Sequence, residues 1–258
     1  MLGAIVGDIV GSPYEYNNIK RKDFELFTDR CFITDDSVLT LAVCHALCQQ
    51  TSDLQKTAQQ SIMDFAWRYA GKDYGDSFRR WMQLPNPTPY NSFGNGAAMR
   101  VSPCSLAAKS IDEAKVMSYA VTSVTHNHLE GLKGAEATAV AGFLAKTGQS
   151  KQAIEKYIND HYYPMDFSLE EIRPDYQYEV SCQGTVPVAL KAFFESDSFE
   201  DALRNAVSIG GDSDTIAAIT GGVAGFYYGI EEWITQKSLN YLDDYLRQIL
   251  RAFEKQFA

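Results

Sequence analysis

The sequence predicts an all-α protein, and three observations support this fold class. Helix-start signals recur along the chain, long apolar stretches follow several of them, and almost no segment alternates apolar and polar residues as a strand does. The weak exception is the segment 176–180. We therefore expect a compact helical array with short strands at most.

The composition favours one domain over residues 1–258. Hydrophobic residues make up 45% of the chain, which is ample for a sizeable core. The proline-rich segment 85–89 marks a loop and not a domain linker, because glycine-rich sequence of low charge resumes directly after it.

Charge and cysteine usage limit the function classes. The formal charge of -10 opposes non-specific nucleic-acid binding, although a modified nucleic acid at a local site stays open. The 5 cysteines lack paired C-x-x-C spacing, so we expect reduced core thiols without a disulfide framework or zinc knuckle. The N-terminal residues have no basic segment and include Asp8, unlike a secretory signal, so a cytoplasmic location is expected.

The N-terminal segment 3–15 is rich in small residues, which favour close packing of a helix against a neighbour. Glu15 ends this segment as a lone acid. Taken alone, it has the features of a surface residue, because glutamate is usually exposed.

The next helix follows Thr34-Asp35-Asp36-Ser37. We expect it to begin near Val38, to end at Cys48 and to be buried on every side, because it is apolar nearly all round. Taken alone, two aspartates and a threonine at this position are typical of solvated capping residues.

Local signals introduce three further helices. Ser110 and Glu113 have the spacing of a capping box, and Ser198 and Asp201 have the same spacing. Pro187 suits the first turn of a helix over 188–194. The segment 161–175 is aromatic, interrupted by proline, and gives no prediction.

The segment 210–215, Gly-Gly-Asp-Ser-Asp-Thr, precedes an apolar run over 215–230. This run is shorter than the roughly 20 residues of a membrane span and contains four glycines, so we expect a core helix and no membrane association. The paired glycines allow close backbone approach, and Asp212 and Asp214 can aim at one point from a non-helical turn.

If the two acidic turns converge, four carboxylates and two threonine hydroxyls share one pocket, which requires cations. Their hard oxygens select magnesium, calcium or manganese over zinc or copper. Magnesium is favoured because a few carboxylates hold it while its remaining waters can be displaced. Two ions balance four charges, so the sequence predicts a binuclear magnesium site, with manganese as the other candidate.

Two further motifs contain polar groups of interest. The glycine-rich segment 94–100 matches neither a P-loop nor a dinucleotide fingerprint, but it could present backbone N–H groups to phosphate. His126 and His128 are consistent with one packed and one solvated histidine. A zinc site is not indicated, because no cysteine or third histidine has a ligand spacing.

Taken in order, five segments resemble the ADP-ribosylglycohydrolase family. They are GDIVGSPYE at 7–15, TDDS at 34–37, GNGAAMRVSP at 94–103, TH at 125–126 and GGDSDTIAAITG at 210–221. Together they span nearly the whole chain.

The resemblance implies an orthogonal all-α bundle with two magnesium ions in a cleft. Glu15 then matches the gating or acid/base carboxylate, with Asp35 or Asp36 as a second candidate for proton transfer. The implied metal ligands are Thr34, Asp35, Asp36, Asp212, Asp214 and Thr215. The implied substrate-binding residues are Gly94, Asn95, Gly96 and Ala97 of the ADP-ribose loop and His126 near the ribose and diphosphate.

The implied function is magnesium-dependent hydrolysis at the anomeric carbon of ADP-ribose attached to a macromolecule, above all to protein arginine. Ser213 replaces the commoner threonine between the two aspartates, and Leu129 stands where many relatives have proline. The chain is also shorter than many members, which leaves the target linkage open.

Two other interpretations compete with this one. The chain could be a non-catalytic ADP-ribose binder or a crystallin-like structural protein, although retention of all six implied ligands favours an enzyme. A magnesium enzyme acting on prenyl diphosphates is less favoured, because position 39 is leucine where a D-D-x-x-D pattern has its third aspartate.

Overall fold

The computed structural model describes residues 1–257 and confirms the all-α prediction, with 14 helices, two short 3-10 helices (η1 and η2) and no sheet in that range. The segment 176–180 forms no strand, and the adjacent Ser181 makes one isolated bridge with Gly94. The elements are α1 (Leu2–Gly11), η1 (Ser12–Tyr14), α2 (Asp35–Cys48), α3 (Leu54–Arg68), α4 (Asp76–Met82), η2 (Asn95–Ala97), α5 (Ser102–Ala107), α6 (Ile111–Thr122), α7 (Leu129–Lys146), α8 (Lys151–His161), α9 (Leu169–Ile172), α10 (Cys182–Phe194), α11 (Phe199–Ile209), α12 (Ser213–Tyr228), α13 (Glu232–Leu239) and α14 (Asp244–Phe257).

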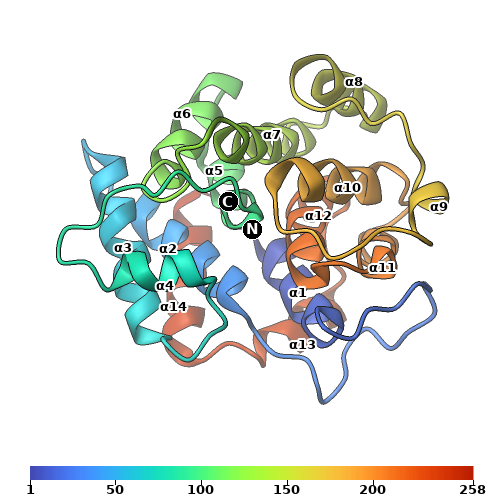
Figure 1. The fold of residues 1–258 in the computed structure, drawn as a ribbon, viewed down its shortest axis with the longest axis horizontal. Helices are drawn as coiled ribbons and strands as arrows, with labels where there is room; N and C mark the ends of the chain where they lie inside the picture. The colour runs from blue at the N-terminus through green and yellow to red at the C-terminus, as the bar shows by residue number, and fades with distance from the viewer. Residues whose placement is uncertain (258) are drawn as a thin grey trace.

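Helix α12 is the central element of the fold, and it confirms the core helix predicted for this apolar stretch. It packs against α1, α7, α10 and α11, and α1 makes the most extensive of these contacts (Figure 1). Within residues 1–257, the helices are too short or too polar to cross a bilayer. Helix α2 lies in the other half of the molecule, between α3 and α14.

The contact between α1 and α12 is a backbone-to-backbone approach. A Cβ atom built on Gly7 would overlap the Ala217 carbonyl and lie 2.8 Å from the Ala218 nitrogen. Gly3 and Gly221 face each other in the same way, each against the other's carbonyl. This confirms the close packing predicted from the small residues of segment 3–15, and it brings the start of α12 beside the end of α1.

Helix α2 begins at Asp35, so the predicted start near Val38 was wrong by one turn, whereas the predicted end at Cys48 is confirmed. The Thr34 hydroxyl caps the helix by accepting from the Asp36 backbone N–H at 3.1 Å. The two aspartates therefore occupy the first helical turn, where the helix dipole favours negative charge.

Helix α10 also begins earlier than predicted. It starts at Cys182, where the Ser181 hydroxyl accepts from the Gly184 N–H at 3.2 Å, and Pro187 therefore lies inside the helix and not in its first turn. Gly184 and Thr185 resemble a loop in the sequence, but the serine cap upstream makes them helical.

The two predicted serine caps are confirmed. Ser110 accepts from the Glu113 N–H at 3.1 Å, and Ser198 accepts from the Asp201 N–H at 3.0 Å. In both motifs the carboxylate bonds to the residue before the cap, so neither forms a full capping box. A full box begins α9, in the stretch that gave no prediction.

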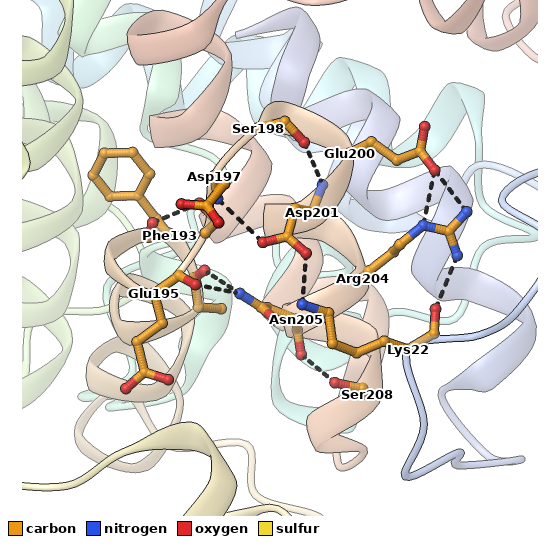
Figure 2. A network of polar contacts seen from close by, with 12 residues as sticks. Lys22, Phe193, Glu195, Asp197, Ser198, Glu200, Asp201, Arg204, Asn205 and Ser208 are labelled. Atoms are coloured by element: carbon orange, nitrogen blue, oxygen red, sulfur yellow. Dashed lines mark hydrogen bonds and ion pairs between the residues drawn. The ribbon is translucent and has the colours of Figure 1, made fainter.

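The loop between η1 and α2 is anchored on α11, as Figure 2 shows. Lys22 forms an ion pair with Asp201, and the Arg204 guanidinium donates to the Lys22 carbonyl at 2.9 Å. The same guanidinium also donates to the Phe24 carbonyl at 2.8 Å. Glu200 holds the same arginine from the previous helical turn. These contacts fix the segment that joins Glu15 to the cap of α2.

Candidate functional site

A cavity of about 570 Å³ lies where the two acidic turns meet. Its walls come from both turns, from the glycine-rich segment that contains η2, and from the segment before α7. Of the residues that the sequence singled out, it is lined by Glu15, Asp35, Asp36, Gly94, Asn95, Gly96, His126, Asp212, Asp214 and Thr215. Thr34 and Ala97 are buried and lie outside this lining.

The turn before α12 is held by backbone geometry that glycine favours. Gly210 and Gly211 both have φ of +74°, and the Asn18 side chain bonds to the N–H and the carbonyl of Gly211 at 2.7 and 2.9 Å. Asp212 is the N-cap residue of α12 and Asp214 lies in its first turn. The prediction that both project from a non-helical turn was therefore wrong for Asp214.

The turn before α2 is held by Asp8, a residue to which the sequence assigned no role in the site. Its fully buried carboxylate accepts from the Thr34 backbone N–H at 3.0 Å and hydroxyl at 2.7 Å, and from both the backbone and the hydroxyl of Ser37. A lone aspartate within an apolar helix was the available signal, because a buried charge needs partners. Asp8 thereby fixes the direction of the first turn of α2.

Three carboxylates come close enough to share one cation. Oxygens of Glu15, Asp212 and Asp214 lie within 4.8 Å of one another, whereas Asp35 and Asp36 line the cavity outside this tight group. Oδ2 of Asp36 and Oδ1 of Asp214 are buried and have no hydrogen-bond partner in the described part of the chain. Unpartnered buried carboxylate oxygens in a hard-oxygen pocket fit a divalent cation such as magnesium.

The electrostatics of the pocket support the same conclusion. Burial raises the pKa of Asp35 to about 8 and raises those of Asp36 and Asp214 well above their ordinary value, and neighbouring carboxylates raise them further. Within residues 1–257, no lysine or arginine forms an ion pair with these three aspartates. Cations are therefore needed to keep the group ionised together.

Glu15 lies at the rim of the cavity, partly buried and beside an aromatic pair that the sequence did not predict. The Tyr178 hydroxyl donates to Glu15 Oε1 at 3.1 Å, and the rings of Tyr178 and Tyr16 stack with centroids 6.2 Å apart. The Tyr16 hydroxyl donates to Asp73 at 3.1 Å. Burial, and then the charge of Asp212, raise the pKa of Glu15.

The glycine-rich segment lies against both the carboxylates and a histidine. The Asn95 side chain donates to Asp212 Oδ2 at 2.7 Å and to the Thr185 hydroxyl at 3.2 Å, so it positions the acidic turn. A Cβ atom on Gly96 would lie 3.4 Å from Nε2 of His126, so the absence of a side chain leaves this ring nitrogen space.

The two histidines have different roles, in line with the expectation of one packed and one more solvated ring. His126 is 5% exposed and lines the cavity. His128 caps α7, where its Nδ1 accepts from the Glu130 N–H at 3.1 Å.

The buried His126 makes stability depend on pH. Burial, and then the Arg100 guanidinium, lower its pKa well below 6.5, so the unfolded chain binds more protons as the pH falls. The contribution of His126 to the free energy of unfolding is therefore complete above pH 6.5. Below that pH the free energy of unfolding decreases by up to about 1.4 kcal/mol per pH unit. Urea titrations at several pH values give the free energy of unfolding of wild type and of His126→Gln. The free energy of wild type minus that of the variant should be constant above about pH 7 and should decrease below about pH 6. A constant difference across this range would contradict the expectation.

Comparisons with known proteins agree with the fold and the motifs. The sequence model of the ADP-ribosylglycohydrolase family matches residues 1–258. ADP-ribosylhydrolase ARH3 of Mus musculus is 25% identical, over 90% of this chain and 83% of its own length. The ADP-ribosyl-dinitrogen reductase glycohydrolase of Rhodospirillum rubrum is 27% identical, over 84% of this chain and 77% of its own length. ADP-ribosylarginine hydrolase Tri1 of Pseudomonas putida is 28% identical, over 91% of this chain and 72% of its own length.

A solved structure, described as an ADP-ribosylglycohydrolase-related protein complex, has the same fold. Its TM-score is 0.74 at 24% identity, and the match covers 100% of this chain and 96% of the other.

Proposed function

Since this chain belongs to the ADP-ribosylglycohydrolase family and is a hydrolase of ADP-ribosyl linkages, we propose that it is magnesium-dependent and removes ADP-ribose from arginine side chains of proteins. The observation that carries the metal dependence is the convergence of five carboxylates, two of which have a buried oxygen without a partner. The arginine linkage is supported by a relative named an ADP-ribosylarginine hydrolase. The carboxylate of Glu15 at the rim also suits a cationic guanidinium, whereas Asp73 is already paired with Arg79.

Two magnesium ions, or manganese in their place, would be held by Asp35, Asp36, Asp212, Asp214, Thr215 and Thr34. The Thr34 hydroxyl already donates to Asp8 and accepts from the Asp36 N–H, so it would offer a cation its remaining lone pair. Bound magnesium supplies Lewis acidity and makes a bound water more acidic. Asp8 and Asn95 would act behind these ligands, because each orients one acidic turn.

The proposed reaction breaks the bond between the anomeric carbon and the guanidine nitrogen, through a state resembling an oxocarbenium ion. Water gives its hydroxyl to that carbon and a proton to the leaving guanidine. Glu15 would transfer the proton, a role supported by its position at the rim beside Asp212 and Asp214, and Asp35 or Asp36 is the second candidate. The Gly94–Ala97 segment and His126 would bind the ADP-ribose, whose phosphates need N–H donors.

Metal removal is the direct test. A chelator-treated sample should release no ADP-ribose from a protein ADP-ribosylated on arginine, and added Mg²⁺ should restore the release, as followed by chromatography of the free ADP-ribose. Substrates linked through serine should react more slowly. Full activity after chelation would refute the metal dependence, and faster release from serine would refute the proposed linkage. Binding of ADP-ribose without turnover in either sample would instead favour the non-catalytic interpretation.

A further inference from the structure

Arg100 is a fully buried cation that has no counterion among the described residues. Arg100 is among the residues that line the cavity, and within residues 1–257 no carboxylate oxygen lies within 4.0 Å of its guanidinium. Burial lowers its pKa to about 10, so it stays charged at neutral pH. Its Nε and Nη1 have no partner, and the shortest bond of its Nη2 goes to the Thr125 hydroxyl at 2.6 Å. A buried charge this costly for folding suggests a function.

The contacts around the Thr125 hydroxyl together determine which way it donates. A guanidinium only donates, so this hydroxyl accepts from Arg100 and keeps its single proton for another partner. The two candidates are His126 Nδ1 at 2.7 Å and the Thr122 carbonyl at 3.4 Å. That carbonyl already accepts the backbone N–H groups of Thr125 and His126 at 3.2 and 2.9 Å. The proton therefore goes to His126 Nδ1.

A neutral imidazole that accepts at Nδ1 carries its proton on Nε2. In His126 this nitrogen lies against the glycine-rich segment, 3.4 Å and 3.7 Å from where Cβ atoms of Gly96 and Gly94 would stand. The ring lines the cavity, so its N–H is available to an acceptor bound there.

We propose that Arg100 and Thr125 are positioning residues that hold His126 as the Nε2–H tautomer, so that it donates a hydrogen bond to an oxygen of ADP-ribose bound over Gly94 and Gly96. The identity of the ligand rests on the proposed function, whereas the tautomer follows from the contacts of the protein alone. Without these contacts, His126 would populate both tautomers. In the Nδ1–H form, the lone pair of Nε2 would then face the anionic diphosphate and could not donate a hydrogen bond to it.

The tautomer can be read directly from ¹⁵N chemical shifts of histidine-labelled protein at neutral pH, with His126 assigned through His126→Gln. Wild type should show the Nε2–H form. Thr125→Val, which keeps the shape and removes the hydroxyl, should give a mixture of tautomers, and so should Arg100→Met. Thr125→Ser should restore the Nε2–H form.

Calorimetry with ADP-ribose supplies the second readout. Loss of one neutral hydrogen bond predicts that the Kd rises about tenfold in Thr125→Val and changes less than about twofold in Thr125→Ser. Thr122→Val is the matched control, because the Thr122 hydroxyl is buried on the same turn without a partner. It should leave both the tautomer and the affinity unchanged.

An Nδ1–H tautomer in wild type would overturn the inference, and so would a Thr125→Val protein that keeps the wild-type tautomer and affinity. If the valine variant does not fold, Arg100→Met tests the same set of contacts, and a wild-type tautomer in that variant would overturn the inference. A wild-type protein that shows the Nε2–H form but does not bind ADP-ribose would refute the ligand and the proposed function together, while the role of Thr125 in fixing the ring would stand.

Discussion

Asp36→Asn and Asp214→Asn are each expected to slow ADP-ribose release by at least about 100-fold while leaving the metal-free protein at least as stable as wild type. Each substitution neutralises a carboxylate whose second oxygen is buried without a partner among other acids. The charge is unfavourable for folding in the absence of metal, so its removal relieves repulsion. The same charge is what binds the cation.

Thermal unfolding with and without Mg²⁺ separates these two effects. Mg²⁺ at a hundred times its Kd should stabilise wild type by about 2.7 kcal/mol for each ion bound, and each ion should raise the Tm by about 5–10 °C. Neither variant should respond to Mg²⁺. Asp166→Asn is the matched control, because this aspartate is exposed and outside the cavity, and it should keep both activity and response. A variant with wild-type activity and a wild-type Mg²⁺ response would remove that aspartate from the proposed metal site.

Local signals were sufficient for much of the fold. Ser110 and Ser198 were predicted as helix caps because the residues that complete each motif are three positions away. The apolar stretch after Asp214 was predicted as a core helix because its composition permits little else. The start of α2 was missed by one turn because aspartates in a first turn look like loop residues when only the apolar pattern is followed.

The arrangement of the site could be predicted only in part. The two acidic turns were predicted from their residue types, but nothing local shows that Glu15 joins Asp212 and Asp214 in one close group. Contacts between distant residues account for what was missed. Asp8 finds its partners only after α1 and α2 pack together.

The glycines of α1 connect the fold to the site, and Gly7→Ala should test this connection. The new methyl group would overlap the Ala217 carbonyl, which is backbone and cannot rotate away. Overpacking commonly costs about 1–3 kcal/mol, and a clash with backbone belongs at the upper end of that range or beyond it. We expect a loss of about 3 kcal/mol or more, equivalent to a fall in Tm of about 6–12 °C.

Activity should fall together with stability in Gly7→Ala, because a wider spacing between α1 and α12 moves Glu15 away from Asp212 and Asp214. Gly71→Ala is the matched control, since a Cβ atom there meets nothing within 4 Å, and it should keep the wild-type Tm. If Gly7→Ala melted within about 2 °C of wild type, the α1 and α12 backbones would not be in direct contact. The position of the two aspartates relative to Glu15 would then need another explanation, because the close approach of these two helices is what places them together.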